Sequence, residues 1–148
     1  MAKKNEIYKE LEQYGINICR TAAKIVAKEL VETAKTAIEL FYADYSPIKY
    51  KRQYYNFRNN SFKKYYKKIG NNIFTGGIEL TPESMDNIYN YPAPAVHRMV
   101  FNKGMHGPNY NYFVPNMSPT PLEILIQKRD YIYDHGEDYI KKAIEQVG

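Results

Sequence analysis

Apolar and charged residues separate onto two faces of a predicted helix in the N-terminal part of the chain. The spacing predicts a helix over residues 6–43, with a candidate break at Gly15. The apolar face holds Ala22, Val26, Leu30, Ala37 and Phe41. The charged face holds Arg20, Lys24, Lys28, Lys35 and Glu39. Because an alanine-rich stripe permits close approach of a sheet or another helix, we expect the apolar face to lie in the core.

A long loop is expected over residues 44–60, directly after the helix. Pro47 disfavours helical geometry at Ser46, and it has no N–H group with which to continue the helical hydrogen bonds. The segment is rich in tyrosine and basic residues and poor in aliphatic ones. Since long loops in a compact domain usually serve a function, this one is a candidate binding segment.

Two β-prone runs predict an antiparallel hairpin within a sheet region over residues 61–102. The runs read SFKKYYKKIG and NNIFTGGIEL, and the turn between them contains Gly70, Asn71 and Asn72. Because side chains alternate between the two faces of a strand, we expect one face of the first run to carry Phe62, Lys64 and Tyr66. The other face should carry Lys63, Tyr65 and Lys67. The Gly-Gly pair of the second run indicates a bulge. Residues expected to pack on the alanine-rich stripe are Phe62, Ile73, Phe74, Ile78 and Leu80.

The rest of the chain returns to the helical period after mostly irregular sequence. The short apolar run of Val96, Met99, Val100 and Phe101 fits either a strand or a helix. An irregular loop is expected over residues 103–118, followed by helices over residues 119–147 with a break near Gly136. Their candidate core positions are Leu122, Leu125, Ile126, Tyr133, Ile140 and Ile144. The sequence therefore predicts a single α+β domain.

Positive charge is concentrated in one segment. The chain has 21 basic and 16 acidic residues. Residues 44–68 contain eight of the basic residues and one acidic residue, so the rest of the chain contains 13 basic and 15 acidic residues. Six tyrosines and two phenylalanines accompany these charges. A local basic patch is typical of a surface that binds one acidic partner, either nucleic acid or protein. Candidate interface residues, of types that suit such contacts, are Tyr50, Lys51, Arg52, Tyr54, Tyr55 and Arg58.

Residues suited to catalysis or metal binding are sparse. His97, His106 and His135 share no recognised metal-ligand spacing, and neither a phosphate-binding glycine loop nor a nucleophile motif occurs. We therefore expect no enzymatic activity, no cofactor and no metal. Cys19 has no second cysteine to pair with, and its neighbours favour a buried position in the core. Because no apolar run is long enough to cross a bilayer, membrane contact is not expected either.

The first half of the chain contains, in this order, Ala34, Lys35, Pro47, Phe57, Ser61 and Phe62. This order resembles the small neck and tail-completion protein family of long-tailed bacteriophages, with Phe57 in place of the family's usual leucine. The stretch FNKGMHGP, residues 101–108, resembles the turn after the sheet, and SPTPLEILIQK resembles the proline-opened C-terminal helix. The family's acidic-threonine-glycine element after the proline is replaced here by IKYKRQYYN.

This resemblance implies a structural virion protein without catalysis. Such a protein would be made in the host cytoplasm and would join the head connector to the tail tube as part of a ring, of six-fold or twelve-fold symmetry. Its partners would be copies of itself and other neck and tail proteins. The basic loop over residues 44–60 would be an assembly surface, and DNA passing through the ring's lumen is a further non-specific contact.

Two other function classes stay open at this level. A small nucleic-acid-binding protein could use the basic, tyrosine-rich segment 49–68, because interleaved cations and aromatic rings suit backbone tracking and base stacking. A hydrolase centred on His97 or His106 has less support, since neither histidine has a legible catalytic partner in the sequence.

Overall fold

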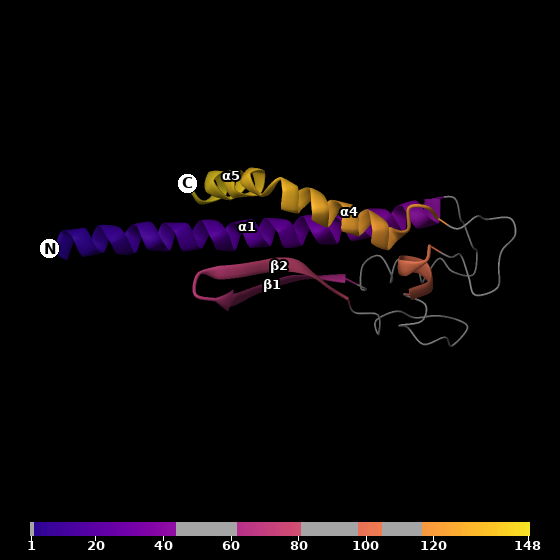
Figure 1. The fold of residues 1–148 in the computed structure, drawn as a ribbon, viewed down its shortest axis with the longest axis horizontal. Coiled ribbons are helices and arrows are strands. Elements are labelled where there is room, and N and C mark those ends of the chain that lie inside the picture. Colours follow the sequence, from indigo (N-terminus) through magenta and orange to yellow (C-terminus); the bar gives the residue numbers. More distant parts are fainter. Residues whose placement is uncertain (1, 44–61, 81–97, 105–116) are drawn as a thin grey trace, which may run out of the picture.

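The computed structural model describes residues 2–43, 62–80, 98–104 and 117–148. In chain order, the elements are α1 (Ala2–Ala43), β1 (Phe62–Gly70), β2 (Ile73–Leu80), the π-helical turn η3 (Arg98–Asn102), α4 (Pro121–Asp134) and α5 (Gly136–Val147). Figure 1 shows α1 as the axis of the molecule, with the β1–β2 hairpin along one side and α4 and α5 along the other. This arrangement confirms the α+β class expected from the sequence.

The buried surface of helix α1 is wider than the single apolar face predicted from the sequence. It continues through Gly15 without the break that the sequence suggested. Of the predicted apolar face, all but Val26 are buried, and Val26 is half-buried. Further buried positions are Ala23, Ala27, Val31, Ala34 and Ile38. The buried arc is wide because the hairpin and the C-terminal helices cover different sides of the same helix.

The hairpin forms at the predicted turn. Its register is regular from the Phe62–Leu80 pair to the Lys68–Phe74 pair, and an irregularity follows between Lys68 and Gly70, beside the turn. Asn72 adopts a φ of 60°, a left-handed conformation that asparagine tolerates better than most residues. The bulge predicted at the Gly-Gly pair is therefore wrong, because Gly76 and Gly77 lie in the regular part of the ladder.

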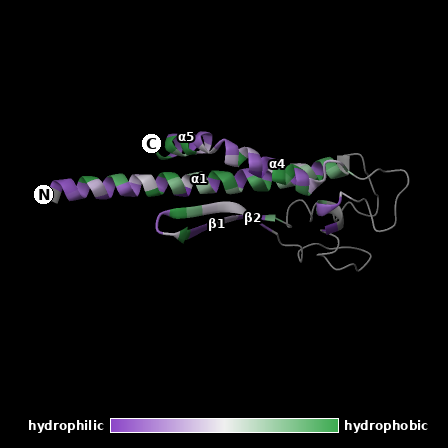
Figure 2. Ribbon diagram, in the orientation of Figure 1, coloured by the Kyte–Doolittle hydropathy of each residue, from purple (hydrophilic) through white to green (hydrophobic). Residues whose placement is uncertain are grey.

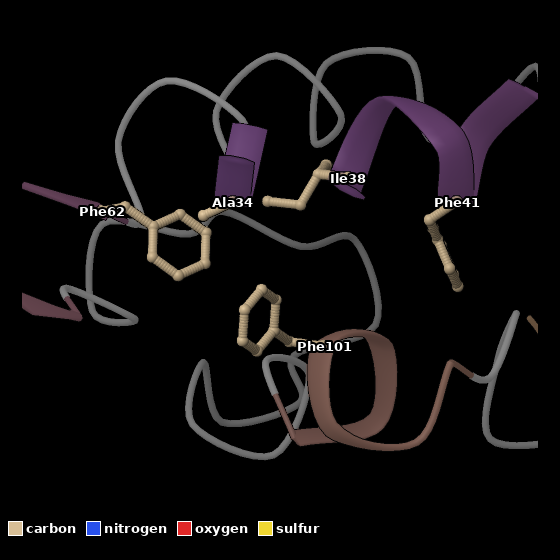
Figure 3. Packing of buried hydrophobic residues seen from close by; sticks show 5 residues of the cluster. All are labelled: Ala34, Ile38, Phe41, Phe62 and Phe101. Atoms are coloured by element: carbon tan, nitrogen blue, oxygen red, sulfur yellow. The ribbon is translucent and has the colours of Figure 1, made fainter. Parts of the chain in front are cut away.

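The hydrophobic core lies where α1, the hairpin and η3 meet. Figure 3 shows Phe62 of β1 beside Phe101 of η3, with their ring centroids 5.0 Å apart. The cluster consists of Ala34, Ile38, Phe41, Phe62 and Phe101. Ile78, Met117, Leu122 and Leu125 pack around it and are partly buried. Ile73, which was also expected to pack on α1, is 55% exposed because it lies next to the turn.

The predicted sheet region over residues 61–102 is too long. Within the described residues, strands end at Leu80, and residues 98–102 form one π-helical turn. The short apolar run around Phe101 has too few residues for its periodicity to distinguish a strand from a helix. The turn nevertheless places Phe101 in the core, where it is 1% exposed.

The two C-terminal helices begin and divide as predicted. Thr120 caps α4 through a capping box, in which its hydroxyl accepts from the Glu123 N–H and the Glu123 carboxylate accepts from the Thr120 N–H. The chain breaks at His135, one residue before Gly136. Leu122 and Leu125 contact the core, as expected.

Four of the six predicted core positions in these helices are wrong. Exposed side chains occur at Ile126, Tyr133, Ile140 and Ile144. Tyr139 and Ala143 are buried instead. The more hydrophobic isoleucines are displaced to the flank because Tyr139, whose hydroxyl reaches a carboxylate on α1, occupies the buried side of α5.

Candidate interaction surface

None of the six interface residues predicted from the sequence lies within the described part of the chain. The residues concerned are Tyr50, Lys51, Arg52, Tyr54, Tyr55 and Arg58, and the whole predicted loop over residues 44–60 lies outside the described residues as well. His97 and His106 also lie outside them. Of the basic segment, the structure describes residues 62–68, which make up most of β1. The candidate surface is therefore built from the hairpin and the part of α1 beneath it.

A close backbone approach fixes the hairpin against α1. A Cβ atom added to Gly76 would lie 1.8 Å from the carbonyl oxygen of Ala23, well inside contact distance. For Gly77, by contrast, such a Cβ would meet among the described residues only the Tyr65 ring, at 3.8 Å. Glycine at position 76 thus lets β2 touch the backbone of α1, where any side chain would hold the two apart.

Two cations and two rings lie side by side at this point of contact. Lys24 Nζ lies 5.3 Å from the centroid of the Tyr66 ring, and Arg20 Cζ lies 5.6 Å from that of Phe74. The two rings are parallel within 5°, with centroids 6.1 Å apart. Arg20 and Lys24 are one helical turn apart and flank Ala23, so the close approach at Gly76 aligns both with the rings. We call these four residues the cation–aromatic stack.

Lysines surround the stack on β1. Lys63, Lys64, Lys67 and Lys68 are all exposed. Phe62 and Tyr66 lie toward α1, in agreement with the predicted alternation, whereas Lys64, predicted on the same side, is exposed. Glu79, opposite Lys63, is the one acidic residue in the hairpin. With Tyr66 37% exposed among these cations, the surface has the composition that suits an acidic partner.

A separate polar cluster joins the C-terminal helices to α1. The Glu29 carboxylate accepts a hydrogen bond from the Tyr139 hydroxyl and pairs with Lys128 at 3.4 Å and Lys142 at 3.3 Å. A shallow open depression of about 360 Å³ adjoins it. Its lining is Glu29, Glu32, Thr33, Thr36, Ile124 and Lys128.

The charges of this cluster explain the titration of its members. Burial alone would raise the pKa of Glu29, but the Tyr139 hydroxyl and the two lysines outweigh burial and hold that pKa below its ordinary value of 4.5. Burial and the neighbouring carboxylate raise the pKa of Tyr139. Both shifts favour the state in which a neutral phenol donates to an ionised carboxylate, so the cluster is a structural clamp between α1, α4 and α5.

Two further chemistry-bearing residues of the described chain are His135 and Cys19. His135 is exposed at the helix junction, where its Nδ1 lies 2.8 Å from the Tyr131 carbonyl and its ring stacks on Tyr131. Cys19 is exposed, so its predicted burial is wrong; neither covering layer encloses that side chain on α1. In the ranges described, no three His, Cys, Asp or Glu side chains gather so as to hold a metal ion. Among those same residues, no helix is long and apolar enough to span a membrane.

Comparisons with known proteins add no relative. No family of known proteins matches the chain, and neither a curated protein nor a solved structure resembles it significantly.

Proposed function

We propose that this protein is a structural virion protein of a phage neck or tail, and that it joins the head connector to the tail tube as part of a ring. The observation that carries the proposal is the order and placement of three elements. Along the chain, a long helix containing Ala34-Lys35 is followed by a hairpin that begins at Phe62 and later by a C-terminal helix opened by Pro121. This order supports the proposal because the family resemblance implies the same succession of elements.

The surface chemistry supports an assembly role. The hairpin presents exposed lysines and the cation–aromatic stack on a rigid support, which suits contact with an acidic neighbouring protein. The polar cluster around Glu29 is occupied by structural hydrogen bonds and ion pairs rather than by a nucleophile and its base. The proposal assigns contact with a neighbouring subunit to the basic segment as well, on its composition of tyrosine, lysine and arginine.

Ring formation is the first property to test. Purified full-length protein should form a closed ring, visible in negative-stain electron micrographs and as one defined mass in native mass spectrometry. A chain that stays monomeric at high concentration, or that polymerises into open filaments, contradicts the proposal.

Binding of nucleic acid through segment 49–68 is the second candidate function. The observation that favours it is the exposure of four lysines around Tyr66 on β1, because a strand that offers both cations and a ring can contact phosphates and bases. Tight, sequence-selective binding at physiological salt would favour this function over the first.

A further inference from the structure

The first turns of α1 extend beyond both layers that cover the rest of the helix. Figure 1 shows neither the hairpin nor α5 reaching the N-terminal end of α1. We call residues 2–14 the N-terminal extension. Figure 2 shows that apolar residues continue into it. Ile7, Leu11 and Tyr14 are 56%, 60% and 43% exposed.

These three side chains form one apolar stripe. Their spacing of four and then three residues places them on a single helix face, as in the seam of a coiled coil. Leu11 lies eighteen residues before Glu29, which corresponds to about five helical turns, so both occupy the same side of α1. Glu29 is the residue that receives Tyr139 of α5. The stripe therefore continues the face of α1 on which a C-terminal helix already lies.

Helix α5 carries a second exposed apolar stripe with the same spacing. Ile140 and Ile144 are 40% and 41% exposed, and Val147, which is half-buried, follows three residues later. Tyr139 and Ala143 of the same helix are used against α1 of their own chain. The isoleucine stripe is thus available to a second helix.

We propose that the N-terminal extension of one subunit packs against the α5 stripe of a second copy of this chain. The extension would then pack against α5 of the second copy, much as the middle of α1 packs against α5 of its own chain. Because the two stripes differ, the contact is heterologous, and repetition of such a contact closes a ring when the rotation permits. The contact stands on its own observations, while its role in a ring rests on the proposed function.

The charges fit this partner. Within residues 2–14, three lysines and three glutamates balance, and α5 holds two lysines against three acids, so neither helix repels the other. The first turn of α1 contains Lys3 and Lys4 and no acidic residue. These positive charges lie at the positive end of the dipole of α1, which is unfavourable. An antiparallel neighbour, oriented as α5 is to α1, brings the negative end of its dipole beside these lysines.

The size of the contact predicts how it acts. Three half-exposed side chains on each helix offer roughly 300 Å² of apolar surface per partner, on the order of 100 Å² each. This is well below the roughly 800 Å² per partner of a stable pair. The contact should therefore be weak between two free subunits and effective in a ring, where each subunit makes it twice.

Cysteine cross-linking of the full-length chain tests the contact. In a Cys19→Ser background, a Leu11→Cys protein is mixed with an Ile144→Cys protein and oxidised. Cross-linked pairs containing one of each are expected, whereas Lys9→Cys, on the opposite face of the extension, should form none with Ile144→Cys. Pairs only between two Leu11→Cys chains, or no mixed pairs, would overturn the proposal.

Two substitutions separate this contact from the proposed function. Leu11→Gln and Ile144→Gln, both on exposed side chains, should leave the circular dichroism spectrum unchanged and raise the concentration needed for self-association at least about tenfold. Tyr133→Ser, 87% exposed on α4, is the matched control and should have no effect. If mixed cross-links form but the protein has no role in head–tail joining, the contact is supported and the proposed function is contradicted. If the protein joins heads to tails but no mixed cross-links form, only the contact is contradicted.

Discussion

The Tyr139 hydroxyl donates a 2.5 Å hydrogen bond to the Glu29 carboxylate, 110 residues away in the chain. This bond connects α5 to the middle of α1, and Lys128 and Lys142 support it through ion pairs with the same carboxylate. The C-terminal helices bury few large apolar side chains, so a charge-assisted bond from a 3% exposed tyrosine is a principal attachment of α5.

Removing the hydroxyl should therefore loosen α5. Tyr139→Phe keeps the ring but leaves Glu29 without one donor, and we expect the free energy of unfolding to fall by about 1–2 kcal/mol. Chemical denaturation measures this difference. Tyr133→Phe, on an exposed ring, is the control and should change nothing; an equal loss in both variants would show that the hydrogen bond is not responsible.

Stability should also decrease in acid through Glu29. Its pKa is lower in the folded protein than in the unfolded chain, so its contribution is present above the unfolded value near 4.5 and is lost as the pH falls through the folded value. Glu29→Gln removes this titration. Denaturation curves across this acid range should show a shallower pH dependence for the variant than for the wild type; parallel curves would contradict the assignment.

Gly76 should tolerate no side chain. Gly76→Ala places a methyl group against the Ala23 carbonyl, and separation of β2 from α1 should cost roughly 1–3 kcal/mol of unfolding free energy. Gly77→Ala is the matched control, because the next residue has room, and its effect should stay below about 1 kcal/mol. Similar melting temperatures for the two variants would mean that the close approach does not hold in solution.

The sequence predicted the elements better than their contacts. The helix over residues 6–43 and the hairpin could be predicted because their periodicity and turn residues are local signals. The role of Gly76 could not, since a bulge and a close backbone approach both favour glycine, and only the position of Ala23 distinguishes them. Tyr139 was missed for a related reason: Ile140 and Ile144 are more hydrophobic, and the carboxylate that draws Tyr139 inward lies far away in sequence.

The candidate surface was predicted in part. The concentration of lysine and tyrosine in residues 62–68 was visible in the sequence, but the contributions of Arg20 and Lys24 were not, because α1 and the hairpin had to be placed side by side first. A basic residue on a charged helix face ordinarily indicates only a solvated surface. Its position over an aromatic ring on another element is a tertiary property.

Contact of the hairpin with DNA should be weak and non-specific. If the surface serves mainly assembly, duplex binding should fall steeply as salt rises and should not depend on sequence. Lys64→Gln and Lys68→Gln should each lower the slope of log affinity against log salt by about 1. Fluorescence anisotropy over a salt series measures the slope, with Lys141→Gln on α5 as the control; an unchanged slope in the hairpin variants would place DNA contact elsewhere.

The loop residues predicted from the sequence should matter for assembly. Tyr50, Arg52, Tyr54 and Tyr55 are of the types enriched in interfaces, and their joint replacement by serine should prevent ring formation or head–tail joining. The melting temperature of the free subunit should change little. Replacement of Asn59 and Asn60 by serine is the control in the same segment. If assembly survives the replacement of Tyr50, Arg52, Tyr54 and Tyr55, those four residues are not part of the interface.

Deletion of the gene that encodes this chain tests the proposed function most directly, since on that proposal the gene belongs to a phage or prophage. Electron microscopy of the resulting lysate should show DNA-filled heads and separate tails, and the wild-type protein supplied from a plasmid should restore joined particles. Complete, infectious, joined particles in the absence of the protein would contradict a role in connecting head and tail.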